Sequence, residues 1–209
     1  MLFYDCATAP SPRRVRIFIA EKGIDVPVQQ IDLRNGEHLQ PEFRAKNPDC
    51  TVPALELDDG TVLAESLAIC TYLEALHPEP PLMGRTDVER AQVLMWNARI
   101  ERTGLSGVGE SFRNHSKGFI GRAVTGSESF DQIPQLVPRG RRMAELFMAN
   151  LDERLASNEF IVGDAFTMAD ITALVTIDMA AWIKLPIPAA CEHLKRWHDS
   201  VSARPSART

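Results

Sequence analysis

The chain has 209 residues, 44% of them hydrophobic, which suits a globular protein with one large domain or two small ones. Its formal net charge of -5, from 23 basic and 28 acidic side chains, argues against a broad basic surface for nucleic acid or an anionic membrane. Small molecules and other proteins are therefore the expected partners.

The first elements are a strand over 2–5 and an amphipathic helix over 11–22. Ser11 suits the N-cap of this helix and Pro12 its first helical position. Gly23 suits the residue just past its end, because glycine readily adopts a left-handed conformation. The segment is therefore predicted as a helix with signals at both ends.

A second strand is predicted over 26–33 and a short helix over 41–46. The alternating segments ALEL and TVL then flank the turn 58–60, whose Asp-Gly pair predicts an antiparallel hairpin. A further helix is predicted over 66–77, ended by a proline. One βαβ unit followed by a hairpin predicts a four-stranded α/β domain over 1–77.

The segment HPEPPLMG contains three prolines in eight residues and opens a predicted linker over 78–86. Only helical patterns follow, so 87–209 is predicted as an all-α helical-bundle domain. An irregular stretch over 116–138 is expected to be either a lid or a surface loop. The helices are expected over 87–112, 143–155, 167–184 and 194–201.

The segment FTMAD marks the start of one of these helices. Thr167 can cap the helix, and Asp170 can reach back to the cap as the acid of a capping box. Phe166 and Ile171 occupy the two hydrophobic-staple positions. We interpret the segment as a folding and stability device.

Neither a secretory signal nor a membrane span is expected. The start, MLFYDC, alternates like a strand, and the apolar stretch 169–190 is interrupted by charged residues and prolines. The cysteines show neither a CxxC pair nor metal-ligand spacing, which predicts reduced thiols in the cytoplasm and no metal site. They are Cys6, Cys50, Cys70 and Cys191.

The start of the first helix is a candidate anion site. A strand, a loop and a capped helix place free backbone N–H groups near residues 9 to 13, at the positive end of the helix. A thiolate would qualify as the anion, because helix N-termini lower thiol pKa values from about 8.5. Such a site could activate a thiol substrate.

Five segments carry a family resemblance: TAPSPRRVRIFIAEKG, GEHLQPEF, TVPAL, ESLAICTYL and FTMAD. In this order and spacing they resemble cytosolic glutathione S-transferases of bacterial type, over nearly the whole chain. The resemblance implies a thioredoxin-like first domain that binds glutathione as co-substrate. It also implies a hydrophobic electrophile as second substrate, a homodimer, a cytoplasmic location and a role in detoxification.

The resemblance implies a glutathione site along the hairpin. A cis Val52-Pro53 bond would turn the backbone N–H and C=O of Val52 toward the cysteinyl part of the peptide. Glu65 would pair with the α-ammonium group, while the hydroxyl and N–H of Ser66 would bind the α-carboxylate. From the residues alone, Pro53 could instead open an edge strand, and Glu65-Ser66 could be an exposed helix start.

Two further positions concern the glycyl end of glutathione. His38 matches a position that contacts the glycyl carboxylate in some classes of the family. Cys50 stands where related sequences often have a second histidine, and a thiol cannot supply that positive charge. Glycyl binding is therefore expected to be weaker or differently arranged.

The position of the family's thiol-activating Ser, Thr or Cys is occupied by Ala9, which offers no side-chain donor. Ser11 and Thr8 remain as catalytic hydroxyl candidates. Two alternatives stay open beside a transferase: a non-catalytic glutathione-transferase-like interaction module, and a glutathione-dependent thiol-disulfide oxidoreductase using Cys6. Candidates for an electrophile pocket are Arg99, Arg102 and Leu105.

Overall fold

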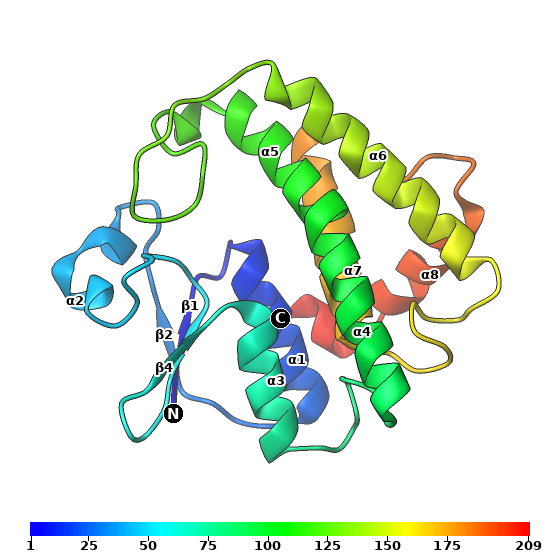
Figure 1. Ribbon diagram of the computed structural model, residues 1–209, viewed down its shortest axis with the longest axis horizontal. Helices are drawn as coiled ribbons and strands as arrows, with labels where there is room; N and C mark the ends of the chain where they lie inside the picture. The colour runs from blue at the N-terminus through cyan, green and yellow to red at the C-terminus, as the bar shows by residue number, and fades with distance from the viewer. The chain divides into compact units, whose positions relative to one another are not determined.

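The computed structural model describes all 209 residues, which form two compact units (Figure 1). The first unit comprises 1–80 with 125–128 and Thr209, and the second comprises 81–124 and 129–208. The first unit is α/β and the second is helical, which confirms the predicted fold class. None of the helices has the length and apolarity needed to cross a lipid bilayer.

The first unit is built on a four-stranded mixed sheet in the order β2-β1-β3-β4. β1 pairs in parallel with β2, whereas β1–β3 and β3–β4 are antiparallel. β2 is shorter than the predicted strand because only three of its residues pair with the short β1. The strands are β1 (Leu2–Asp5), β2 (Val28–Gln30), β3 (Ala54–Glu56) and β4 (Val62–Ala64).

Helices cover both faces of this sheet (Figure 1). On one face, Phe43 of α2 (Pro41–Arg44) packs edge-on against the Tyr4 ring, with 5.7 Å between the centroids. Phe3 and Leu55 alternate to the other face and have no exposed surface. On that side lie α1 (Pro10–Lys22) and α3 (Ser66–Leu76), which pack against each other. The sheet is thus buried on both faces at its centre.

α1 begins earlier than the sequence predicted. Pro10 is its first helical residue and Ala9 its N-cap, so Ser11 is not the N-cap and Pro12 is not the first position. The first N–H groups of a helix have no intrahelical partner, so prolines are tolerated there. The predicted end is confirmed, because Gly23 adopts φ 62° and its N–H closes the last turn.

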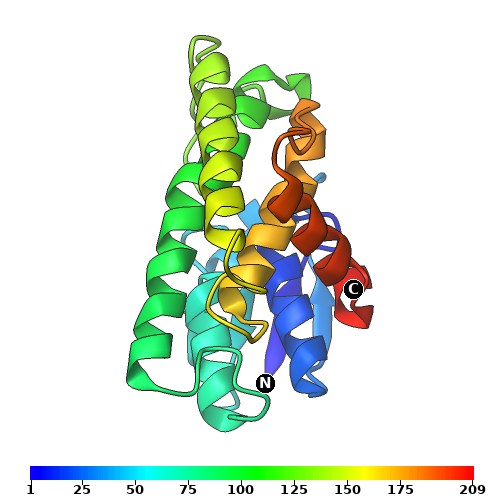
Figure 2. The same ribbon diagram turned by 90° about the vertical axis from the view of Figure 1, so that its right-hand side faces the viewer.

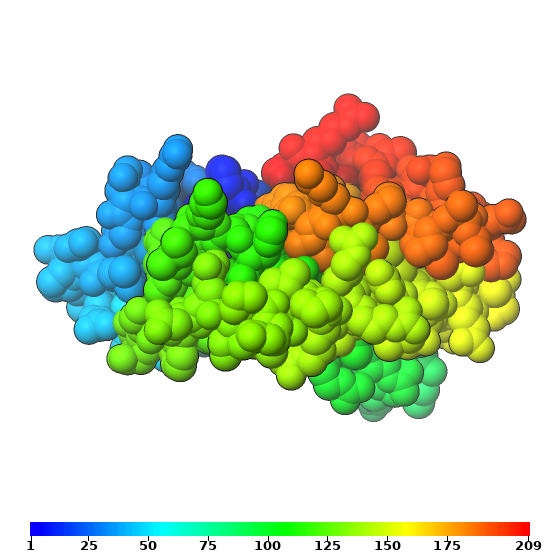
Figure 3. Space-filling model, turned by 90° about the horizontal axis from the view of Figure 1, so that it is seen from above, coloured from blue at the N-terminus to red at the C-terminus, as the bar shows by residue number.

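The second unit is organised around α7 (Met168–Ala180), in which every residue except Asp178 is buried (Figure 2). α6 (Leu136–Leu155) begins before the predicted residue 143, because Pro138 falls in its first turn, where proline is tolerated. The outer side of α6 forms a long strip of the surface in Figure 3. The other long helices are α4 (Asp87–Arg99), the π-helical η2 (Ile100–Leu105), α5 (Ser106–His115) and α8 (Glu192–Ser202).

The irregular stretch after α5 folds back on itself. It contains the short helix η3 (Lys117–Phe119) and an isolated bridge between Arg122 and Phe130. Arg113 donates to three consecutive carbonyl groups of the stretch, those of residues 122 to 124, at 2.8 to 3.2 Å. The half-buried Arg113 therefore holds this part of the stretch against α5.

Candidate functional site

The turn from β1 into α1 leaves few backbone donors for a ligand. Pro10 and Pro12 have no N–H, and the N–H groups of Ala9 and Arg13 donate to carbonyl groups of the same turn. The N–H of Ser11 has no acceptor in the chain. The group of free N–H groups expected near residues 9 to 13 is therefore reduced to Ser11.

Ser11 is held at two points by buried side chains. Arg14 Nη2 donates to Ser11 Oγ at 3.4 Å, and the Ser66 hydroxyl donates to the Ser11 carbonyl at 2.9 Å. Arg14 is 3% exposed and Ser66 is 1% exposed. Because Ser11 Oγ accepts from Arg14, the Ser11 hydroxyl still has its own proton to donate to a ligand.

A partly buried ion pair holds the turn just before Ser11. Arg16 Nη1 lies 2.5 Å from Asp5 Oδ1, and Gln30 Nε2 donates to Asp5 Oδ2 at 2.6 Å. Gln30 Oε1 accepts the N–H of Ala7 at 2.9 Å, while Arg16 donates to the Ala7 carbonyl at 3.1 Å. The backbone that leads into α1 is thus held from two sides.

The second hydroxyl candidate, Thr8, lies beside Cys6. Cys6 Sγ and Thr8 Oγ1 are 3.5 Å apart, and Thr8 is exposed while Cys6 is 9% exposed. Ala9 has no polar side-chain atom. Ser11 is therefore the only residue of the first turn of α1 that combines an unbonded N–H with a hydroxyl group.

The chain segment before β3 offers an open backbone edge. The Val52-Pro53 bond is cis, as expected. Neither the N–H nor the carbonyl group of Val52 has a backbone partner, because the pairing of β3 with β1 begins at Ala54. An extended peptide can therefore add to the sheet at Val52.

The start of α3 combines a free carboxylate with free amides. Glu65 is exposed, its carboxylate has no partner, and its backbone adopts φ 68° and ψ 126°. Non-glycine residues rarely adopt such angles, and those that do cluster at ligand sites. The N–H groups of residues 66 to 68 are unbonded at the positive helix end. A ligand with adjacent ammonium and carboxylate groups fits both features.

The glycyl candidates lie around α2. His38 is half-buried in the short helix η1 (Glu37–Leu39). Cys50 is buried, and its backbone adopts φ 54°. Nε of the exposed Arg44 donates a hydrogen bond to Cys50 Sγ at 3.4 Å. The guanidinium of Arg44 therefore brings a positive charge to the position where Cys50 supplies none.

The hydroxyl group of Tyr4 is bonded within the sheet, to Glu56 of β3. It donates to the carboxylate of Glu56, which also pairs with Lys46 Nζ at 2.5 Å. Burial, followed by the interaction with Glu56, raises the pKa of Tyr4 to about 12. Tyr4 is thus protonated at neutral pH, and its proton is already donated to Glu56 rather than to a ligand.

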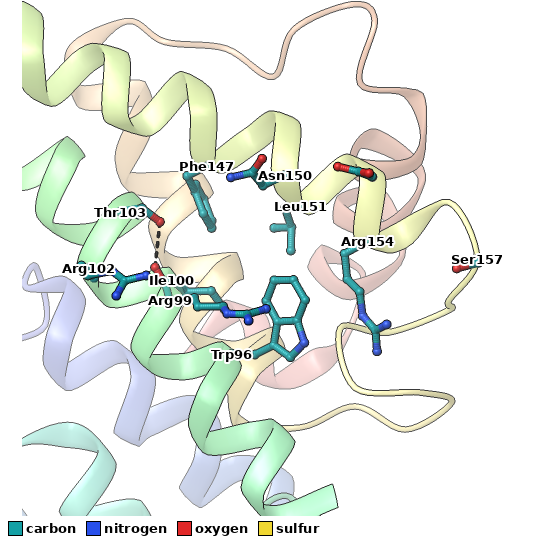
Figure 4. Close-up of a pocket in the computed structure, with 11 residues that line it drawn as sticks. Trp96, Arg99, Ile100, Arg102, Thr103, Phe147, Asn150, Leu151, Arg154 and Ser157 are labelled. Carbon is teal, nitrogen blue, oxygen red and sulfur yellow. Dashed lines mark hydrogen bonds between the residues drawn. The ribbon is translucent and has the colours of Figure 1, made fainter.

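The helical unit contains a groove of about 440 Å³ between α4–η2 and α6 (Figure 4). Ile100 and Leu151 form part of its buried wall. Arg99 and Arg154 flank the Trp96 ring, with their guanidinium carbons 5.1 and 5.6 Å from its centroid. Two of the predicted pocket residues, Arg99 and Arg102, line this groove, and Leu105 does not.

Family models match both units. The glutathione S-transferase N-terminal domain matches residues 8–76, and the glutathione S-transferase C-terminal domain matches residues 130–205. The chain is also 40% identical to Glutathione S-transferase 2 of Saccharomyces cerevisiae, over 100% of this chain and 88% of that protein. The chain belongs to the cytosolic glutathione S-transferase superfamily. The resemblance read from the five sequence segments is therefore confirmed.

Solved structures of glutathione S-transferases have the same fold. A glutathione S-transferase domain-containing protein of Marinobacter aquaeolei VT8 is 42% identical, with a TM-score of 0.90 over 99% of both chains. A glutathione S-transferase of class Gtt2 from Vibrio parahaemolyticus is 32% identical, with a TM-score of 0.85 over 100% of this chain and 96% of that chain. The thioredoxin-like first unit and the helical second unit are features of this superfamily.

Within this glutathione S-transferase, the residues predicted to bind glutathione or to activate its thiol all lie in the first unit. Ser11 and Ser66 are joined directly, and Cys50 contacts Arg44. The ligand roles of these residues remain predictions. Sequence reasoning missed Arg14 and Arg44, and no sequence pattern pairs Arg44 with Cys50. The helical spacing of Ser11 and Arg14 was the one available signal for the first pair.

Proposed function

We propose that the first unit binds glutathione and stabilises its thiolate, which this glutathione transferase uses to attack a hydrophobic electrophile. The observation that carries the proposal is the hydrogen bond from Ser66 to the Ser11 carbonyl. This bond joins the start of α3, where the Glu65 carboxylate has no partner, to the start of α1. There Ser11 offers an unbonded N–H and a hydroxyl group. A γ-linked tripeptide needs both subsites at a fixed separation.

In the proposed complex, the peptide extends along the open edge. Val52 pairs with the cysteinyl backbone, and Pro53 begins the strand that carries this edge. Glu65 binds the α-ammonium group, and the Ser66 N–H binds the α-carboxylate. The Ser66 hydroxyl, which the sequence assigned to that carboxylate, already donates to Ser11.

The glycyl carboxylate is proposed to lie near His38 and Arg44. Arg44 supports this arrangement because it supplies a guanidinium beside Cys50, where a thiol alone would supply no charge. An exposed arginine can bind a carboxylate with two parallel hydrogen bonds. The proposal thus replaces a second histidine with an arginine from α2.

The proposed mechanism is activation of the substrate's own sulfur. The thiol proton leaves to water, and the N–H and hydroxyl of Ser11 donate to the resulting thiolate. Thr8 is the second candidate for the hydroxyl role. The electrophile is proposed to bind near the domain 87–209, which follows the linker 78–86. The proposal also includes a homodimer, a cytoplasmic location and a role in detoxification.

The test is the ultraviolet thiolate band of glutathione bound to the full-length protein, titrated with pH. Retention on immobilised glutathione, with elution by free glutathione, first establishes binding. The expected midpoint lies at least about one pKa unit below that of free glutathione, as at other activated thiols. A midpoint equal to that of free glutathione would contradict thiol activation, and failure to bind would contradict the whole proposal.

A further inference from the structure

Arg14 is a buried cation next to the candidate catalytic hydroxyl. It is 3% exposed and lies on the same turn of α1 as Ser11, whose Oγ is 3.4 Å from Arg14 Nη2. Arginine is rarely buried to this extent unless its charge serves a partner. The glutathione roles assigned above do not include this side chain.

The surroundings of Arg14 are a set of charged groups between α1 and α3. Glu74 of α3 pairs with Lys22 Nζ of α1 at 2.5 Å. Burial raises the pKa of Cys70, and the positive charge of Arg14 opposes that rise from across the helix pair. The charge of Arg14 thus acts on Ser11 in the first turn of α1 and on Cys70 in the middle of α3.

We propose, on the basis of the glutathione site above, that Arg14 is a positioning residue that orients the Ser11 hydroxyl toward the glutathione sulfur. A guanidinium has donors only, whereas a serine hydroxyl has one proton and two acceptor lone pairs. Ser11 Oγ therefore accepts from Arg14 and directs its own proton elsewhere. No covalent step is involved, because the thiol proton leaves to water and Ser11 keeps its proton.

The cation also strengthens the hydroxyl as a donor. A hydroxyl oxygen that accepts a charge-assisted hydrogen bond is polarised, so its own proton forms a stronger bond to an anion. Ser66 adds a second restraint by fixing the Ser11 carbonyl. Arg14 and Ser66 together give Ser11 a defined orientation at a site where Ala9 lacks the hydroxyl typical of the family.

The experiment compares thiolate titrations of glutathione bound to full-length variants, with the dissociation constant measured separately. Arg14→Gln is expected to raise the midpoint by about one pKa unit, the size of a weakened hydrogen bond from the Ser11 hydroxyl to the thiolate. Arg14→Lys should raise it by less, because lysine keeps the charge but loses the planar fork. In a Ser11→Ala background, neither change at Arg14 should raise the midpoint further.

The matched control is Arg13→Gln, which removes one positive charge at the neighbouring position and should leave the midpoint unchanged. Thermal unfolding shows which variants fold. If Arg14→Gln does not fold, Arg14→Lys alone decides the outcome. The absence of any rise, or an equal rise with and without the Ser11 hydroxyl, would overturn the role of Arg14. A wild-type midpoint equal to that of free glutathione would instead overturn the proposed function.

Discussion

The N-termini of α7 and α1 differ in whether their hydrogen-bond donors have an acceptor within the chain. At α7, Asp170 accepts from the N–H and hydroxyl of Thr167 and from the N–H of Ile161, and it is fully buried. At α1, no side chain caps the helix, and the N–H of Ser11 has no acceptor. A helix start that satisfies its own donors stabilises the fold, whereas one that leaves a donor open can bind a ligand.

The start of α3 resembles α1 rather than α7. Glu65 occupies the N-cap position without capping, and it holds a positive φ of 68°. Its carboxylate makes no hydrogen bond to the helix amides, so both are left for a ligand. The contrast is therefore between the capped start of α7 and the open starts of α1 and α3, and substitutions can test it.

The largest expected effect is on the capped helix. Asp170→Ala leaves four buried donors without an acceptor, including Trp197 Nε1 at 2.9 Å, and should lower the free energy of unfolding by about 3 kcal/mol or more. Urea denaturation measures this loss. Asp170→Asn, which keeps part of the acceptor set, should lower the free energy of unfolding by less. Equal stability of the wild type and Asp170→Ala would contradict the stabilising role of the capped start of α7.

The next effect is on glutathione affinity. Glu65→Gln removes the partner proposed for the α-ammonium group and should weaken glutathione binding about 10- to 100-fold, as expected for a charged hydrogen bond. Calorimetric titration gives the dissociation constant. The exposed Glu42 on α2 provides a control, since Glu42→Gln should leave the affinity as it is. An unchanged affinity in Glu65→Gln would remove α3 from the site.

The third effect is on the rate. Ser11→Ala removes one donor to the thiolate and should lower kcat/KM about tenfold, which corresponds to about 1.4 kcal/mol. The melting temperature should fall only modestly, because Ser11 does not cap α1 but its Oγ accepts from the buried Arg14. Thr8→Val is the comparison, and a larger rate loss in Thr8→Val than in Ser11→Ala would transfer the hydroxyl role to Thr8.

A smaller effect is expected at the glycyl end. Arg44→Gln should weaken glutathione binding about fivefold, in the range of an exposed charge pair. The same variant should bind γ-glutamylcysteine, which lacks the glycyl carboxylate, as well as the wild type does. Equal weakening for both peptides would show that Arg44 acts through the fold around Cys50 and not through that carboxylate.

The smallest effect is expected at Cys6. Cys6→Ser should leave conjugation of an electrophile unchanged, because the sulfur that reacts belongs to glutathione. Glutathione-dependent disulfide reduction should be negligible in both proteins. Substantial reductase activity in the wild type that Cys6→Ser abolishes would favour the oxidoreductase alternative.

Much of the fold was predictable because its signals are local. Gly23 marked the end of α1, the Asp-Gly pair marked the hairpin, and Thr167 with Asp170 marked the start of α7. The start of α1 was predicted wrongly, because Ser11 and Pro12 carry the residue types of a cap and a first position. The preceding Pro10 is equally suited to that position, and local propensity does not choose between two adequate prolines.

By itself, the amino-acid sequence determined the family, the two-unit division of elements and the absence of a catalytic hydroxyl at Ala9, since these depend on residue types and spacing along the chain. Only the tertiary structure decided that Ser11 is held by Arg14 and by Ser66, and that Arg44 stands beside Cys50. The reason is physical. A hydrogen bond between residues 55 positions apart depends on how α1 and α3 pack, and no local propensity encodes that contact.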